Sequence, residues 1–176
     1  EDTALAMMEQ IQGGTLPIVL DADAINILST HRNWLSRIPK RSILTPHLGE
    51  LERLIGKCMD TYERLMKVKE LAAYLQSYII VKGAWTCIVT PEGNYYFNPT
   101  GNPGMATGGS GDVLTGILLG LLAQGYERED ACRLGVYVHG LAGNLAAEEK
   151  TEIGMTANDI IESLPKAWKT LTTKNS

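Results

Sequence analysis

Three short apolar runs, spaced between helical patterns, constrain the fold more than any other feature of the sequence. Residues 16–23 (LPIVLDAD), 42–46 (SILTP) and 77–83 (SYIIVKG) are typical of buried strands, whereas residues 47–56 and 61–76 repeat their apolar side chains with the period of a helix. Strands that alternate with helices tend to pair in parallel, because each helix returns the chain to the same edge of the sheet. The sequence therefore predicts an α/β fold with a mostly parallel sheet flanked by helices.

The other segments predict an antiparallel addition to the sheet and a helical C-terminal part. TCIVT (86–90) and NYYF (94–97) flank Pro91-Glu92-Gly93, a turn signal that predicts a hairpin at one side of the sheet. Further helices are predicted at residues 4–12, 111–124, 128–149 and 156–171. The first should stop at the Gly13-Gly14 pair. No linker or repeat interrupts the pattern, so we expect residues 1–176 to form a single domain.

The composition argues against several classes of function. The 176 residues carry a net charge of -4 without a basic run, which disfavours nucleic acid as a partner. The longest apolar stretch, residues 117–123, is far too short to span a membrane. Cys58, Cys87 and Cys132 are scattered, which favours a reducing, cytoplasmic environment over a disulfide framework. The histidines show no metal-ligand spacing, so no residue is predicted as a metal ligand.

A glycine-rich segment, NPGMATGGSGDVLTG at residues 102–116, runs directly into an apolar helix pattern. It is not a P-loop, because no lysine follows a glycine, and it lacks the third glycine of the dinucleotide fingerprint. Gly108, Gly109 and Gly111 let backbone N–H groups approach a ligand, and the helix aims the positive end of its dipole at the same space. The segment predicts a phosphate site; the simpler alternative is a flexible turn before a helix.

Asp112 places a negative charge where this helix begins, beside the predicted phosphate site. One interpretation is an N-terminal cap of the helix, worth ~1 kcal/mol. The other is a general base that accepts the proton of a hydroxyl group attacking a phosphoryl group. In the second case backbone donors and a magnesium ion would replace the missing lysine. The spacing alone leaves both interpretations open.

Four stretches in order resemble a known family. They are VLDADAINIL (19–28), LTPHLGELERL (44–54), VKGAWT (81–86) and NPTGNPGMATGGSGDVLTG (98–116). Together they closely resemble the ADP- or ATP-dependent NAD(P)H-hydrate dehydratases, which have the ribokinase-like fold. The resemblance covers nearly the whole chain. The family's domain is longer at its N-terminus, so we expect this chain to be the C-terminal portion of such a domain, without its first strands.

The resemblance implies a repair reaction on damaged cofactors. The family phosphorylates the ring hydroxyl of hydrated NADH or NADPH from a nucleotide and then eliminates phosphate, which restores NAD(P)H. It implies ADP or ATP with Mg²⁺ as cofactors and the hydrated dinucleotide as substrate. It also favours a homo-oligomer, as does the sheet edge that the missing strands would leave exposed. Neither nucleic acid nor a membrane is expected as a partner.

The resemblance also assigns roles to residues. Asp112 is implied to be the catalytic base and to contact the substrate, and His47 and Glu50 are implied to belong to the substrate site. The residues implied to bind the nucleotide are Lys82, Gly83, Ala84, Trp85, Thr86, Asn102, Gly104, Met105, Ala106, Thr107, Gly108, Gly109, Ser110 and Gly111.

Simpler interpretations of the charged residues stay open beside these roles. His47 follows Thr45 and Pro46, an N-cap and first-turn pair that would make it an ordinary helix-start residue. Lys82 ends a strand and can reach a phosphate, but a solvated strand end is an equal alternative. Glu50 is either a partner of the site or a charge on a helix face.

Four further polar residues are interpreted from their positions alone. Asp21 is interpreted as structural, and Asp23 and Asn26 as facing a cleft. His139 is interpreted as a core histidine rather than a ligand.

Two other functions compete with the dehydratase. A ribokinase-like kinase of a vitamin or sugar would share the scaffold and the glycine-loop aspartate, because a fold does not fix its chemistry. A non-catalytic nucleotide-binding or assembly module is the third hypothesis. The combined match of NPGMATGGSGD and LTPHLGE favours the dehydratase.

Overall fold

The computed structural model describes residues 2–13 and 16–172. The chain divides into two compact units, of which unit 1 comprises Glu1–Gly83 and Cys87–Phe97, and unit 2 comprises Ala84–Thr86 and Asn98–Ser176. The expectation of a single domain over residues 1–176 stays a prediction.

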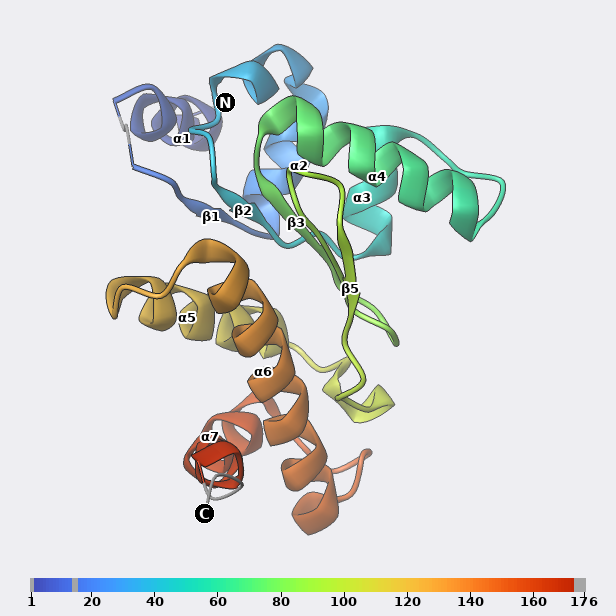
Figure 1. The fold of residues 1–176 in the computed structure, drawn as a ribbon, viewed down its shortest axis with the longest axis vertical. Helices are drawn as coiled ribbons and strands as arrows, with labels where there is room; N and C mark the ends of the chain where they lie inside the picture. Colours follow the sequence, from blue (N-terminus) through green and yellow to red (C-terminus); the bar gives the residue numbers. More distant parts are fainter. Residues whose placement is uncertain (1, 14–15, 173–176) are drawn as a thin grey trace. The chain divides into compact units, whose positions relative to one another are not determined.

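Unit 1 is built around a five-stranded sheet with the order β1-β2-β3-β4-β5 (Figure 1). Its elements are α1 (Asp2–Gly13), β1 (Val19–Leu20), α2 (Asp23–Thr30), the 3-10 helix η1 (Arg32–Arg37), β2 (Ile43–Leu44), α3 (Leu48–Ile55), α4 (Thr61–Leu75), β3 (Tyr78–Val81), β4 (Cys87–Val89) and β5 (Tyr95–Phe97). Strands β1, β2 and β3 pair in parallel, whereas β3, β4 and β5 pair antiparallel. The predicted α/β class and the hairpin at one side of the sheet are confirmed.

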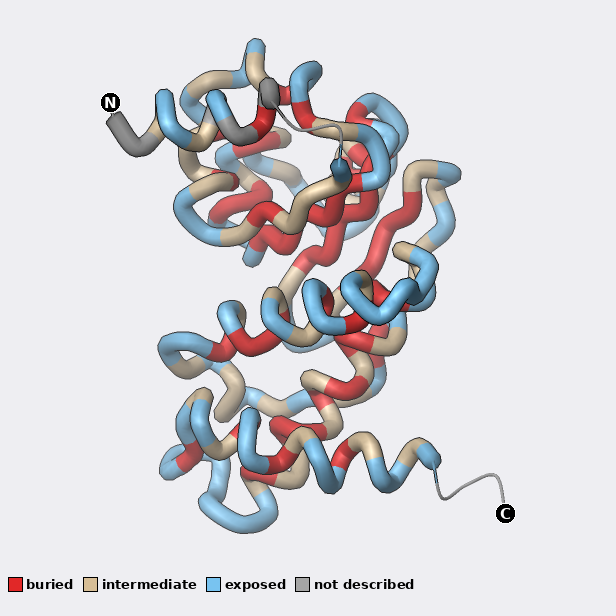
Figure 2. The backbone as a smooth tube through the Cα atoms, turned by 90° about the vertical axis from the view of Figure 1, so that its left-hand side faces the viewer, coloured by how far each residue is buried: buried red, intermediate tan, exposed pale blue. Residues whose placement is uncertain are grey.

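The strand register aligns one row of apolar side chains across this sheet. Leu20 pairs with Leu44, Leu44 with Ile79, and Ile79 with Val89, so the four side chains lie on the same face. All four residues of β3 are buried, as expected for a strand inside an α/β sheet (Figure 2). The short apolar runs of the sequence thus become the centre of unit 1.

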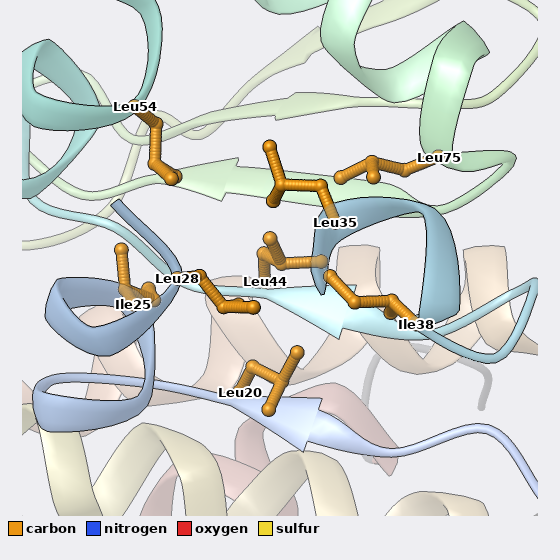
Figure 3. Packing of buried hydrophobic residues seen from close by; sticks show 8 residues of the cluster. All are labelled: Leu20, Ile25, Leu28, Leu35, Ile38, Leu44, Leu54 and Leu75. Carbon is orange, nitrogen blue, oxygen red and sulfur yellow. The ribbon is translucent and has the colours of Figure 1, made fainter. Parts of the chain in front are cut away.

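Helices cover this face of the sheet through a cluster of leucine and isoleucine side chains (Figure 3). Leu20 and Leu44 of the sheet meet Leu28 of α2 and Leu54 of α3 within this cluster. Each fully buried side chain of this size contributes roughly 1.5–3 kcal/mol by leaving water. The helical periodicity of the sequence therefore serves to bury one side of α2, α3 and α4 against the strands.

The predicted boundaries differ from the structure at several points. The run at residues 16–23 forms only the two-residue strand β1, because Asp21 and Ala22 turn into α2 directly after it. The 3-10 helix η1 lies in a segment for which we made no prediction. Helix α1 ends at Gly13, whereas Gly14, the second residue of the predicted stop, lies outside the described residues.

Up to residue 172, where the described part of unit 2 ends, the unit contains three long helices and a short 3-10 helix, all of which follow β5. They are η2 (Pro103–Met105), α5 (Ser110–Ala123), α6 (Arg128–Lys150) and α7 (Ala157–Thr172). The core of the unit joins Val113 of α5, Val138 and Ala142 of α6, and Ile160 of α7. Small residues on α6 let the helices approach closely. The three predicted C-terminal helices are confirmed within two residues at each end.

No helix in the described part of the chain is both long and apolar enough to cross a bilayer.

Candidate functional site

The glycine-rich segment forms a turn that opens helix α5. Gly109 is the N-cap residue, and its φ of 86° lies in the left-handed region that disfavours residues with a side chain. The backbone N–H groups of Gly111 and Asp112, in the first turn, donate to no residue in the described part of the chain. Because the helix dipole is positive at this end, the turn presents free donors and a positive field together.

Asp112 lies in the first turn of α5, but it does not cap the helix. The N-cap is Gly109, and no side chain caps this end. The Asp112 residue is exposed, and its carboxylate forms no hydrogen bond or ion pair within residues 2–13 and 16–172. The capping interpretation of Asp112 is therefore wrong. The carboxylate is free to act on a ligand held at the turn.

A cavity of about 870 Å³ opens beside this turn, between α5 and α7 of unit 2. Gly109 and Asp112 lie at the N-terminal end of α5, and Asn158 adds an amide from the first turn of α7. Further along the helices the lining becomes apolar, through side chains such as Ile117 and Trp168. Asp112 thus borders a space of ligand size within its own unit.

The first part of the glycine-rich segment is joined by hydrogen bonds among its own residues. Asn102 is the N-cap of η2, and its Oδ1 accepts a hydrogen bond from the Gly104 N–H at 3.0 Å. Met105 and Ala106 close the short helix with backbone bonds to Asn102 and Pro103. These bonds give the first part of the loop a defined local structure, and whether the loop is flexible stays a prediction.

The KGAWT segment is divided between the two units. Lys82 and Gly83 belong to unit 1, and Ala84, Trp85 and Thr86 belong to unit 2. The Trp85 residue is 71% exposed, so its indole is available for stacking. In unit 2 the Thr86 carbonyl accepts a hydrogen bond from the Asn98 N–H at 2.9 Å, which ties the segment to the start of the glycine-rich stretch.

Lys82 of unit 1, which follows β3, is held by an acid that follows β1, two strands away in the sheet. Its Nζ lies 2.6 Å from Asp21 Oδ1, and the two side chains are only 22% and 12% exposed. Burial acts to raise the pKa of Asp21, but the hydrogen bond and charge of Lys82, with a hydrogen bond from Thr45, outweigh burial and leave this pKa lowered. Lys82 is therefore not the solvated strand end of the simpler interpretation, and Asp21 is structural, as interpreted.

His47 and Glu50 form a reciprocal cap at the start of α3. His47 Nδ1 accepts from the N–H groups of Gly49 and Glu50, while a Glu50 carboxylate oxygen accepts from the His47 N–H at 2.9 Å. The other carboxylate oxygen lies 3.2 Å from His47 Nε2. Because Nδ1 accepts, the ring proton must reside on Nε2, where it can be donated to Glu50.

This cap corrects the simpler interpretation of His47. The N-cap of α3 is His47 itself, two residues after the expected Thr45, so Pro46 is not in the first turn. The His47 and Lys82 backbones pair as a parallel bridge, and the Lys82 N–H donates to the Pro46 carbonyl at 2.8 Å. Unit 1 therefore brings His47, Glu50, Lys82 and Asp21 to the carboxyl ends of its parallel strands, where open α/β sheets bind ligands.

Asn26 and Asp23, which were predicted to face a cleft, lie in different settings on α2. Asn26 Oδ1 accepts a hydrogen bond from Arg53 Nη1 at 2.7 Å, which links α2 to α3, whereas Asp23 is exposed in the first turn of α2. Whether either faces a cleft stays a prediction. Among the described residues, no three His, Cys, Asp or Glu side chains lie close enough to hold a metal ion.

Sequence reasoning missed two residues that contact the glycine-rich loop. His139 and Asn144 of α6 form hydrogen bonds to Ser110 and Asn102 respectively. His139 had been interpreted as a core histidine, but it is half-buried and faces the loop. The available signal was the HGLAGN stretch, in which polar and small residues recur one helical turn apart.

Comparisons with known proteins agree on one family. A family model described as NAD(P)H-hydrate dehydratase matches residues 1–166. The bifunctional NAD(P)H-hydrate repair enzyme Nnr of Thermofilum pendens is 40% identical over 173 residues, which are 97% of this chain and 33% of that protein. The chain thus spans a third of the length of this relative.

Solved structures support the same assignment. The ADP/ATP-dependent NAD(P)H-hydrate dehydratase from Bacillus subtilis, co-crystallised with ATP/Mg²⁺, matches with a TM-score of 0.76 and 34% identity over 92% of this chain and 57% of that chain. A ribokinase-like superfamily protein from Enterococcus faecalis V583 matches with a TM-score of 0.80 and 31% identity over 97% of this chain and 59% of that chain. The predicted ribokinase-like fold is confirmed.

Proposed function

Because the chain belongs to the NAD(P)H-hydrate dehydratase family, we propose that it carries the catalytic loop of an enzyme that repairs hydrated NADH and NADPH. The reaction is a nucleotide-dependent dehydration in which the ring hydroxyl is phosphorylated and phosphate is then lost. One observation carries the proposal. Asp112 is exposed and without a partner among the described residues, beside free backbone donors at the start of α5.

The start of α5 fits the phosphate groups of ADP or ATP. The left-handed Gly109 turns the chain so that the Gly111 and Asp112 N–H groups stay available, and anions bind readily at such helix ends. The nucleotide would supply the phosphoryl group, and Mg²⁺ would neutralise part of its charge. Since no cluster of metal ligands is present among the described residues, we assign no protein ligand to Mg²⁺.

Asp112 acts on the hydroxyl group of the hydrated substrate. Its carboxylate accepts the hydroxyl proton as the oxygen attacks the terminal phosphorus. The carbon–oxygen bond of the phosphorylated ring then breaks and the adjacent ring carbon loses a proton to water, which releases phosphate and restores the ring double bond. The cavity beside Asp112 offers space in unit 2 for a ligand that approaches this carboxylate.

The remaining site residues keep roles that follow from the resemblance. We propose that the KGAWT segment and residues 102–111 bind the nucleotide, and that His47 and Glu50 contact the hydrated dinucleotide. The exposed Trp85 supports a stacking role, and the cap at α3 would hold His47 in one orientation for a ligand.

The cellular setting is proposed from the cysteines and from the resemblance. Burial raises the pKa of Cys87 to about 11 and raises that of Cys132 as well, so both thiols stay protonated and inert at neutral pH. All three cysteines are free, which supports a reducing, cytoplasmic setting. We propose a homo-oligomer as well, on the resemblance alone.

Replacement of Asp112 tests the function. We expect Asp112→Ala to lower the rate of NADH recovery from hydrated NADH, with ATP and Mg²⁺ present, roughly 10²–10⁴-fold, because the base is lost. Calorimetry should show that ATP still binds, since the backbone donors remain. Asp130→Ala is the matched control, because it removes an exposed acid from the first turn of α6 in the same unit. The protein should be assayed at its full natural length.

Three outcomes would reject the proposal. Recovery of NADH at the full rate by the Asp112→Ala variant would exclude this base. Accumulation of a stable phosphorylated small molecule, without free phosphate or restored NADH, would instead support the ribokinase-like kinase. Nucleotide binding without any turnover would support the non-catalytic module.

A further inference from the structure

One face of helix α6 is packed against the loop that precedes α5. The residues on this face are His139, Gly140, Gly143 and Asn144, two adjacent pairs that follow each other by one helical turn and so lie on the same side of the helix. Each of them contacts or hydrogen-bonds a residue between positions 100 and 110, all within unit 2. The reaction proposed above gives this face no role.

The backbone of α6 itself touches the loop. A Cβ atom added to Gly140 would clash with the side chain and backbone of Thr100, and one added to Gly143 would clash with the Met105 side chain. At Gly140 no side chain fits unless the loop backbone at Thr100 moves, whereas at Gly143 the Met105 side chain would have to move. The Thr100 hydroxyl also donates to the Tyr137 carbonyl at 2.9 Å. The start of the loop is thus fixed to α6 by close packing.

Two polar side chains of α6 flank this close contact. Asn144 Oδ1 accepts from Asn102 Nδ2 at 3.1 Å, and the other side of the same amide, Asn102 Oδ1, accepts from the Gly104 N–H. His139 Nε2 lies 3.3 Å from Ser110 Oγ and shares a hydrogen bond with it. The loop is therefore held near both of its ends, at Asn102 and at Ser110.

The hydrogen bond between His139 and Ser110 is more informative than the one between Asn144 and Asn102, because Ser110 belongs to α5. It is the first residue of that helix, it is only 6% exposed, and Gly111 and Asp112 follow it directly. A bond that fixes the Ser110 side chain also fixes the rotation of the first helical turn. That turn carries the free N–H groups and the Asp112 carboxylate.

We propose that His139 is a positioning residue of the dehydratase. Its hydrogen bond to Ser110 sets the direction in which Asp112 and the first-turn N–H groups of α5 point. The expected effect of His139 on kcat rests on the proposed function. Its effect on the structure of the first turn of α5 does not. We assign His139 no contact with the substrate or the nucleotide; its effect on Asp112 passes through Ser110.

The test uses His139→Ala and His139→Gln in the protein at its full natural length. A glutamine amide can take the place of the ring Nε2, so it should restore what alanine removes. We expect His139→Ala to lower kcat for hydrated NADH about 10- to 100-fold, because small displacements of catalytic groups are costly. Amide exchange of residues 107–113, measured without ligands, should become faster in the alanine variant and return toward normal in the glutamine variant.

Controls separate positioning from general loss of stability. Glu149→Ala changes an exposed residue of the same helix on the side opposite this face, and it should alter neither kcat nor the exchange of residues 107–113. If His139 acts through Ser110, the His139→Ala and Ser110→Ala double variant should be no slower than the more impaired single variant.

The inference fails if His139→Ala leaves the exchange of residues 107–113 unchanged, or if glutamine is no better than alanine in both measurements. Additive losses in the double variant would also overturn it. Should the unaltered enzyme show no dehydration at all, the proposed function fails on its own, and the exchange of residues 107–113 still decides the role of His139.

Discussion

At the scale of single residues, the pair formed by Asp21 and Lys82 shows how a charged group is kept near a strand end. The two residues are 61 positions apart, and their bond joins the ends of β1 and β3. The folded state lowers the pKa of Asp21 below its ordinary 3.8. Its stabilising contribution is therefore complete above pH 3.8 and is lost as the pH falls through the lower, folded value.

Replacement of Asp21 by Asn should reveal this contribution. We expect Asp21→Asn to lower the free energy of unfolding by about 1–3 kcal/mol at pH 7, because Lys82 is left half-buried without its counter-charge. The difference from the unaltered chain should shrink as the pH falls below 3.8, since protonation then removes the charge in both. Urea unfolding at several pH values measures this. Asp23→Asn, an exposed neighbour, should show a much smaller change; equal losses in the two variants would contradict the prediction.

At the scale of one element, helix α3 depends on a cap made by two ionisable side chains. Glu50 is 4% exposed, and its carboxylate accepts from the His47 backbone and faces the His47 ring. Such reciprocal caps satisfy donors that a helix end would otherwise leave unpaired. The same two residues are proposed to contact the substrate, so a structural effect and a catalytic effect must be told apart.

Two variants of Glu50 separate the two roles. Glu50→Ala should destabilise the chain by roughly 0.5–2 kcal/mol, because the His47 N–H loses its acceptor. Glu50→Gln keeps an oxygen acceptor and should retain most of the stability. A rise in KM for hydrated NADH in the glutamine variant, with an unchanged melting temperature, would then identify a direct role of the Glu50 charge. An unchanged KM would restrict Glu50 to the cap.

At the scale of the whole molecule, each unit has its own core, and unit 2 also exposes an apolar groove. The cavity between α5 and α7 is lined by Val113, Ile117, Leu121 and Leu164, and Ile161 is 49% exposed at its rim. Helix α5 is apolar on nearly all of its faces. Apolar grooves of this kind bind other apolar surfaces, and they also bind fluorescent dyes that report such surfaces.

The groove should therefore bind anilinonaphthalene sulfonate in the 176-residue chain. We expect Ile161→Lys to remove most of the dye fluorescence, because the charge lies at the rim of the groove. Ile153→Lys is the matched control: Ile153 is fully exposed in the same unit, but it does not line the groove. Equal fluorescence from the two lysine variants would show that the dye binds elsewhere.

Much of the fold could be predicted because the signals are local. The strands β2 and β3, the β4–β5 hairpin and helices α5 to α7 follow from apolar periodicity and turn residues, which act within a few positions. The cap of α3 was misplaced by two residues, since His47 is an uncommon capping residue and Thr45 a common one. Asp112 was found as the candidate base from its place after the glycines.

The sequence by itself determined the α/β class, the glycine-rich turn and the acid that follows it, because these depend on neighbouring residues. Only the tertiary structure decided that Lys82 pairs with Asp21, that Asp112 has no partner among the described residues, and that His139 faces Ser110. Such contacts join side chains that are many positions apart in the chain. Their geometry depends on how strands and helices pack, and packing is set by the summed burial of many apolar side chains rather than by any local pattern.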